Sequence, residues 1–217
     1  MAKTAKRKYS RPALKKTVVV NSEASIDAMG TYVNQTMSAI YSIDVILFYI
    51  GSQEVADEAN QKIAELFEKK LQLFDKEIDK LLAIVDENDI EDISYTEQRS
   101  KDYKVYSPLC ATYLKLFNKF ELNTNLIDRL WLNCELSSSQ RNSKVLKLGR
   151  HMRNVSRQII NMSKIARKLA QSEGKEDEVN ASIKELTDTD AKETNIEETS
   201  ITAEEVPQKE DETKAVA

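Results

Sequence analysis

The sequence predicts a mainly α-helical protein, built from long amphipathic helices with one or two short strands. Apolar residues recur at steps of three and four over long stretches, which is the period of a helix with one buried face. Only 4 glycines and 3 prolines occur in 217 residues. So few turn-forming residues disfavour a sheet-rich fold with many tight turns.

Acidic and basic residues are separated along the chain and divide it into three parts. Residues 1–16 form a basic arm of seven lysines and arginines without an acid. Residues 172–217 carry 15 acidic and 5 basic residues, a net charge of −10, which leaves +6 for the rest because the total is −4. The acidic tail has almost no large apolar residues, so it cannot form a core. We expect both ends to be disordered and residues 17–171 to form a single mainly helical domain.

The first elements are a short strand and two helices. Residues 17–20 are β-branched and predict a strand, after which Asn21 or Ser22 can cap a helix that runs to Gly51. Gly30 argues against an unbroken helix there. A second helix over about 52–85 has a regular apolar seam, made of Phe67, Leu71, Phe74, Ile78, Leu81 and Val85.

The middle of the chain predicts a connector, a strand and two shorter helices. Residues 86–97 hold six acids and no base, which is typical of an exposed connector. Residues 101–106 alternate and are rich in strand-forming types, and Ser107-Pro108 then marks a helix start. We expect helices at 108–121 and 124–136, divided near Asn123.

The last helix is expected from Ser139 to about Gln171 and has two different edges. No acid lies between Glu135 and Glu173, where nine lysines and arginines occur. An apolar stripe with heptad spacing runs along the same segment, and we expect it to pack on the 67–85 seam or on a second subunit. It comprises Val145, Leu148, Met152, Val155, Ile159, Met162, Ala166 and Leu169.

Residues suited to catalysis or cofactor binding are few. The glycines are isolated, which excludes a phosphate-binding loop, and His151 is the single histidine. Cys110 and Cys134 lie in helix-like apolar stretches. We therefore expect no enzyme activity, no metal, no cofactor and no small-molecule substrate. The longest apolar run, residues 43–50, is too short to cross a bilayer, and no signal peptide is apparent, so we expect a cytoplasmic protein without membrane contact.

The pattern that remains is one of nucleic-acid binding. A strand followed by two helices, at about 101–136, is the arrangement of a ribbon-helix-helix domain. In such a domain two copies of one strand pair across a homodimer, and the ribbon enters the DNA major groove. Alternation places Tyr103 and Val105 on one face. The other face carries the expected base contacts Asp102, Lys104 and Tyr106. An ordinary core hairpin or edge strand fits the pattern equally well, and the strand at 15–20 is a rival ribbon.

Basic residues around these strands, along the arm and on the last helix are candidates for contacts with DNA phosphates. The backbone amides at the Pro108 helix start could hold a further phosphate. The candidate side chains are Arg99, Lys101, Arg7, Lys8, Arg11, Lys15, Lys16, Arg150, Arg153 and Arg157.

Three segments together resemble a known family. They are Tyr106 to Leu114 (YSPLCATYL), Phe117 to Phe120, and Leu126 to Leu132 (LIDRLWL). The pattern is similar to that of the AcaB-like transcriptional activators of conjugative plasmids and integrative conjugative elements. It covers roughly residues 12–170, and it implies a homodimeric ribbon-helix-helix fold. The expected DNA contacts above come from charge and alternation rather than from the family.

The leading hypothesis is therefore a DNA-binding transcriptional regulator of a conjugative mobile element, acting as a homodimer on double-stranded DNA. RNA polymerase is a further candidate partner, through the acidic tail, although that tail could equally be an inert solubiliser. Two alternatives stay open. One is a structural or accessory helical protein of the conjugation machinery, and the other is a nucleic-acid-binding protein without sequence preference.

Overall fold

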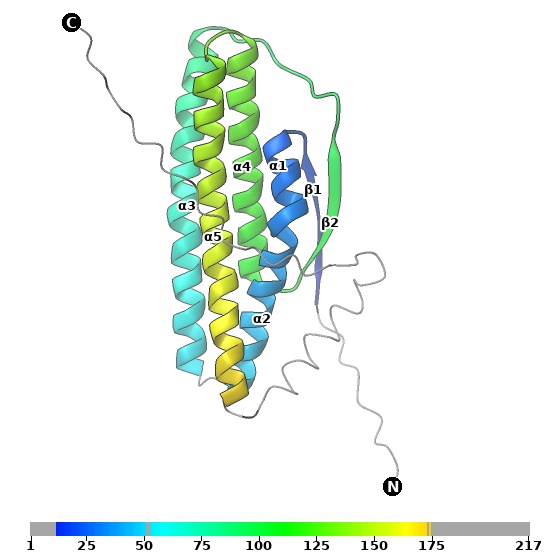
Figure 1. Cartoon of the computed structure of the whole chain (residues 1–217), viewed down its shortest axis with the longest axis vertical. Coiled ribbons are helices and arrows are strands. Elements are labelled where there is room, and N and C mark those ends of the chain that lie inside the picture. Colours follow the sequence, from blue (N-terminus) through cyan, green and yellow to red (C-terminus); the bar gives the residue numbers. More distant parts are fainter. Residues whose placement is uncertain (1–11, 51–52, 173, 175–217) are drawn as a thin grey trace, which may run out of the picture.

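The computed structural model describes residues 12–50, 53–172 and 174. Within them, long helices run side by side and a two-stranded antiparallel ribbon lies along one side of the bundle (Figure 1). Most of the basic arm and nearly all of the acidic tail lie outside the described residues. The elements in chain order are β1 (Leu14–Val20), α1 (Glu23–Ala28), the π-helical turn η1 (Met29–Val33), α2 (Asn34–Ile50), α3 (Gln53–Glu87), β2 (Arg99–Val105), α4 (Pro108–Leu132) and α5 (Ser138–Ser172).

The hydrophobic core lies around α4. Tyr113, Phe117 and Phe120 on α4 are fully buried, and the expected seam of α3 packs against this helix. The ring centroids of Phe74 and Phe120 lie 6.4 Å apart, and those of Phe67 and Tyr113 lie 6.0 Å apart. Every residue of the predicted α3 seam is buried, which confirms that part of the sequence prediction. None of the described helices is long and apolar enough to cross a membrane.

The apolar stripe of α5 is buried as predicted in its first part, from Leu148 to Ile159. Beyond this point the buried positions shift to Ser163 and Ala170, while Leu169 is 55% exposed. A straight helix has 3.6 residues per turn, so a heptad stripe drifts away from a fixed partner. Within the chain the partner also differs from the expected 67–85 seam, because α5 packs mainly on α2 and only slightly on α3.

The predicted break near Asn123 is wrong, since α4 continues to Leu132. The Asn123 side-chain amide donates to the Phe74 carbonyl at 3.1 Å and to the Lys119 carbonyl at 2.9 Å. The Thr124 hydroxyl donates to the Phe120 carbonyl at 3.0 Å. These polar side chains therefore bond within and between helices instead of capping a new one. The expected strand–helix–helix unit at 101–136 is in fact one strand and one helix, with α5 as the next helix.

The chain from α1 to α2 follows one continuous helical path, but η1 inserts a π turn that contains Gly30. A π turn holds one extra residue, which rotates the buried face that follows. The sequence predicts a departure from a regular helix at Gly30, and the π turn lies at this residue.

Polar contacts fix the connector between α3 and β2 onto the helices. The Arg129 guanidinium donates to the backbone carbonyls of Ile90 and Glu91. Tyr95 donates to the buried carboxylate of Asp128 at 3.0 Å, and Arg141 pairs with the same carboxylate at 2.6 Å. The acidic connector was predicted, whereas its attachment to α4 and α5 was not. These contacts hold the chain that leads into β2 against the helices.

Candidate nucleic-acid interface

The ribbon joins the two strands that the sequence offered as rivals. β1 pairs with β2 of the same chain, with Thr17 opposite Asp102 and Lys15 opposite Lys104. The expected pairing of two copies of one strand is therefore not what forms here. Both segments contribute to a single ribbon, because each one buries alternate residues on α4.

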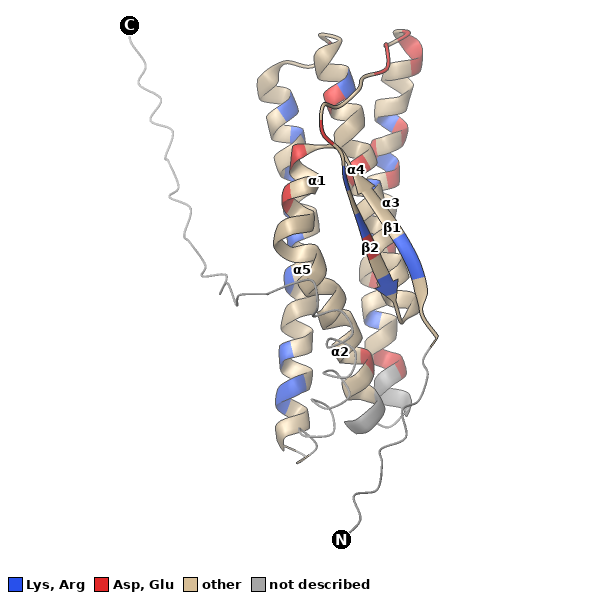
Figure 2. Ribbon diagram, turned by 90° about the vertical axis from the view of Figure 1, so that its right-hand side faces the viewer, with Lys and Arg blue, Asp and Glu red and all other residues tan. Residues whose placement is uncertain are grey.

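Alternation separates the ribbon into a buried inner face and an exposed outer face. Val18, Val20, Tyr103 and Val105 are buried on the inner side. The outer side is exposed and presents Lys15, Thr17, Val19, Ser100, Asp102 and Lys104. The predicted faces of β2 are thus confirmed for Asp102, Tyr103, Lys104 and Val105. Figure 2 shows the ribbon lying across α4, with lysine and arginine positions on both strands.

Asp102 lies at the centre of the outer face and is bonded to the neighbouring strand. The Lys15 ammonium lies 2.7 Å from one carboxylate oxygen, and the Thr17 hydroxyl donates to the other at 2.6 Å. The hydrogen bonds from Lys15 and Thr17 lower the pKa of Asp102. Its charge is therefore compensated within the ribbon, which reduces its repulsion of a polyanion.

The third expected base contact, Tyr106, lies apart from this face. β2 ends at Val105, and Tyr106 is half-buried with its ring packed on Tyr41 of α2, centroid to centroid 5.7 Å. The structure therefore brings together Asp102 and Lys104, and places Tyr106 in the helix packing. Sequence reasoning missed Thr17, Val19 and Ser100, although the alternation of β1 could have indicated the first two.

Two of the expected phosphate contacts lie within β2, on its inner face. Arg99 and Lys101 share the inner face with Tyr103, and the Lys101 ammonium lies 5.7 Å from the centroid of the Tyr103 ring. Arg99 is exposed, and Lys101 is half-buried. Arg7, Lys8 and Arg11 lie outside the described residues.

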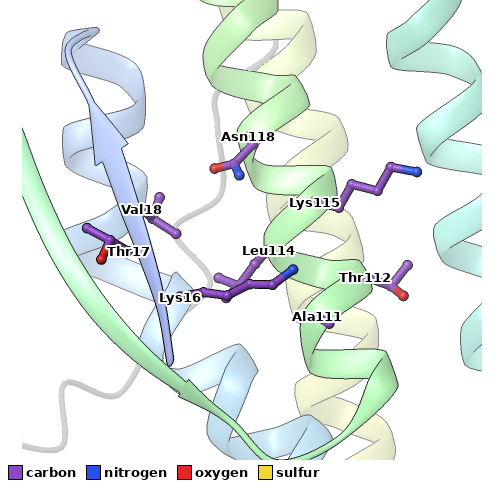
Figure 3. Close-up of a pocket in the computed structure, with 8 residues that line it drawn as sticks. All are labelled: Lys16, Thr17, Val18, Ala111, Thr112, Leu114, Lys115 and Asn118. Carbon is purple, nitrogen blue, oxygen red and sulfur yellow. The ribbon is translucent and has the colours of Figure 1, made fainter. Parts of the chain in front are cut away.

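Lys16 lies beside a hollow of about 390 Å³ between β1 and α4. Figure 3 shows its side chain reaching from β1 towards Leu114, while Thr17 points away from the hollow. Lys115 and Thr112 on α4 point towards the side of α3. Lys16 and Lys115 both line the hollow, together with polar and apolar side chains. Two lysines beside the ribbon suit a passing DNA phosphate better than an enclosed apolar small molecule.

The helix starts next to the ribbon each hold a protein carboxylate. Glu121 accepts hydrogen bonds from the amides of Asn21 and Ser22 and from the Ser22 hydroxyl. At the other start, Ser107 caps the amide of Cys110 and hydrogen-bonds Asp44, whose pKa is raised by burial. Anion binding by the amides at the Pro108 start, which the sequence suggested, would have to compete with these groups.

The basic residues of α5 are not brought to the ribbon. Arg150, Arg153 and Arg157 are exposed, but Figure 1 places α1 and α4 between the ribbon and α5. A second basic region, which the sequence reasoning missed, is a groove of about 400 Å³ between α3 and α5. It is lined by Lys69, Lys76, Lys80, Lys144, Lys147 and His151, among others.

The two residue types most often used in catalysis, cysteine and histidine, lie in different surroundings. The Cys110 thiol is buried and donates to the Met37 carbonyl at 3.8 Å; burial raises its pKa to about 11, so little thiolate forms at neutral pH. Burial and the nearby Lys70 and Lys147 lower the pKa of His151. Among the described residues, no cluster of three or more His, Cys, Asp or Glu side chains could hold a metal ion.

Comparisons with known proteins give one informative match. No protein-family model matches the chain, and no curated protein matches it. The structure is similar to the crystal structure of AcaB from uropathogenic E. coli, with a TM-score of 0.74 and 32% sequence identity. The match covers 78% of this chain and 89% of that chain.

Proposed function

The chain belongs to the AcaB family, and we propose that it is a DNA-binding transcriptional regulator of a conjugative mobile element. The observation that carries the proposal is the ribbon, whose exposed face presents Lys15 and Lys104 above a fixed helical core. Seven residues per strand at about 3.4 Å each give a ribbon roughly 24 Å long. The B-DNA major groove, about 12 Å wide, admits a ribbon of two strands.

Each group then has a distinct task. Lys104 and Asp102 contact base edges, because a lysine can bond guanine acceptors and a carboxylate can accept from a cytosine amino group. Lys16, Arg99 and Lys101 belong to the inner face of the ribbon, away from the bases, and neutralise phosphates, which positions the protein without selecting a sequence. Arg150, Arg153 and Arg157 lie on α5, away from the ribbon, and cannot contact the major groove that the ribbon enters. They supply a general electrostatic attraction to DNA.

The homodimer that the family resemblance implies would need a surface other than the β1–β2 pairing, since that pairing is complete within one chain. Exposed apolar side chains on α5, namely Leu146, Ile165 and Leu169, are candidates for such a surface. RNA polymerase is a second proposed partner, bound through the acidic tail. Such a regulator would act in the cytoplasm and would need no cofactor or catalytic group.

Recovery of DNA bound to the protein in cells, followed by affinity measurements on the recovered sites, tests the proposal. A regulator should bind its site at least ~10³-fold more tightly than unrelated DNA at physiological salt. The promoters beside its own gene are the first place to look. A ratio near one would refute the regulator and favour binding without sequence preference, for which the lysines between α3 and α5 offer a surface. No DNA binding at all would favour an accessory protein of the conjugation machinery.

A further inference from the structure

The chain contains the same strand–helix–helix unit twice, 85 residues apart. β1 begins at Leu14 and β2 at Arg99, and α3 spans Gln53–Glu87 while α5 spans Ser138–Ser172. Adding 85 to the first and last residue of β1 and α3 gives the bounds of β2 and α5. The helix caps Ser22 and Ser107 obey the same offset, and each accepts from the amide three residues on.

The two units also bury side chains at equivalent positions. Both strands have an identical alternation of exposed and buried positions. The π turn η1 adds one residue to the first unit, so equivalent residues of α2 and α4 are 84 positions apart. With this offset the buried residues Ala39, Ile43 and Ile46 of α2 correspond to the buried residues Asn123, Ile127 and Leu130 of α4. On the long helices the buried residues Ile63, Phe67, Leu71, Phe74, Ile78 and Val85 of α3 correspond to the buried residues Leu148, Met152, Ser156, Ile159, Ser163 and Ala170 of α5.

The two units are related as by a twofold axis. Thr17 and Asp102 face each other at the centre of the ribbon, and they are also equivalent residues, since they are 85 apart. A twofold axis through this pair generates the rest of the antiparallel register. The helices obey it too, because α3 packs mainly on α4 and α5 packs mainly on α2. One chain therefore holds both halves of an interlocked pair.

The outer face of the ribbon breaks this symmetry. Lys15 and Lys104 face each other at one end, whereas Val19 and Ser100 face each other at the other end. The twofold axis exchanges these two pairs, so equivalent positions carry different chemistry. A lysine pair suits guanine, which offers two acceptors in the major groove, while an apolar valine suits the thymine methyl group.

Resting on the proposed function, we infer that one chain is the complete DNA-reading unit and recognises a non-palindromic site. The half-site under Lys15 and Lys104 is rich in guanine, and the half-site under Val19 and Ser100 carries a thymine. A homodimer that reads DNA through one ribbon formed between copies would instead require a palindrome.

The test uses the full chain and the site selected from random duplexes. Native mass spectrometry with an excess of a duplex of roughly 16 base pairs, about one and a half turns, should give equal numbers of chains and duplexes, whether the protein is a monomer or a dimer joined through α5. The selected sequence should lack twofold symmetry. Two chains on a palindromic minimal site would overturn the inference while leaving the regulator intact, whereas selection of no sequence would refute the regulator itself.

A symmetrised ribbon sharpens this test. The double substitution Lys15→Ser with Val19→Lys gives each end of the ribbon one lysine and one serine, so the selected site should become palindromic on either side of the central bases that Thr17 and Asp102 face. Lys15→Ser alone is the matched control: it removes one lysine from the guanine half-site and leaves Asp102 without its ion pair, so it should lower affinity, roughly 5- to 150-fold, without creating a palindrome. Both positions are exposed, and circular dichroism verifies that the variants fold. An unchanged selected site in the double variant would contradict the assignment of the reading residues.

Discussion

Glu121 supplies the sharpest stability prediction, because its buried carboxylate joins α4 to the start of α1. One oxygen accepts from the Asn21 amide at 2.6 Å and the Ser22 amide at 3.2 Å, and the other accepts from the Ser22 hydroxyl at 2.5 Å. Glu121→Ala leaves all three donors without this acceptor. Its effect should extend to the ribbon, since β1 ends at Val20, immediately before these residues.

The expected loss follows from the separate contacts. A hydrogen bond to a charged group contributes roughly 1.5–3 kcal/mol. Water can reach the half-buried Asn21 amide, and the Ser22 hydroxyl can rotate, so the losses do not add in full. We expect Glu121→Ala to lower the free energy of unfolding by about 2–4 kcal/mol.

Urea unfolding followed by far-ultraviolet circular dichroism measures this change. With a slope near 2 kcal/mol per molar urea, the midpoint should fall by roughly 1–2 M. Glu121→Gln keeps one acceptor oxygen, so its unfolding midpoint should lie between those of the natural chain and Glu121→Ala. The control is Glu65→Ala on the exposed face of α3, which should change stability by less than about 0.5 kcal/mol. If Glu121→Ala behaves like this control, the carboxylate does not hold the helix start.

Three further predictions concern the core, the thiols and the ribbon. Phe117→Ala should cost about 3–5 kcal/mol in urea unfolding, because the ring is fully buried and a cavity remains; a loss below 1 kcal/mol would show a loosely packed core. Iodoacetamide should label exposed Cys134 and spare Cys110 until the chain unfolds, since burial raises the Cys110 pKa to about 11; peptide mass spectrometry would reveal equal labelling if this is wrong. Asp102 has a lowered pKa in the folded state, so its contribution to stability is present above its unfolded pKa and is lost as pH falls through the folded value. Asp102→Asn should therefore be less stable than the natural chain at neutral pH and equal to it in acid well below 3.8; a difference that persists in acid would contradict the Lys15 and Thr17 contacts.

The helices were predictable because their periodicity is local. The α3 seam from Phe67 to Val85 and the bounds of α5 follow from repeated apolar spacing in one segment. The helix break near Asn123 was mispredicted because polar residues also occur inside helices when a neighbouring carbonyl is available. Asn123 finds such a partner in Phe74, which lies on another helix and leaves no trace in the local sequence.

The candidate site was predictable only in part. Alternation along β2 correctly separated Asp102 and Lys104 from Tyr103. The pairing of β1 with β2 was not predictable from either strand, because it joins residues 85 positions apart. The repeat that would have indicated it is hidden by substitution: Ser156 and Ser163 of α5 stand where α3 has Leu71 and Ile78, so the buried positions repeat while the residue types do not.

Base reading by the ribbon is the central claim, and one comparison tests it most directly. The affinities of the natural chain, Lys104→Glu and Arg157→Glu are measured for the selected site and for an unrelated duplex at physiological salt. The ribbon should give Lys104→Glu a specificity ratio close to one, while Arg157→Glu should weaken binding to both duplexes about equally. If Lys104→Glu keeps the preference of the natural chain, the ribbon does not read the DNA.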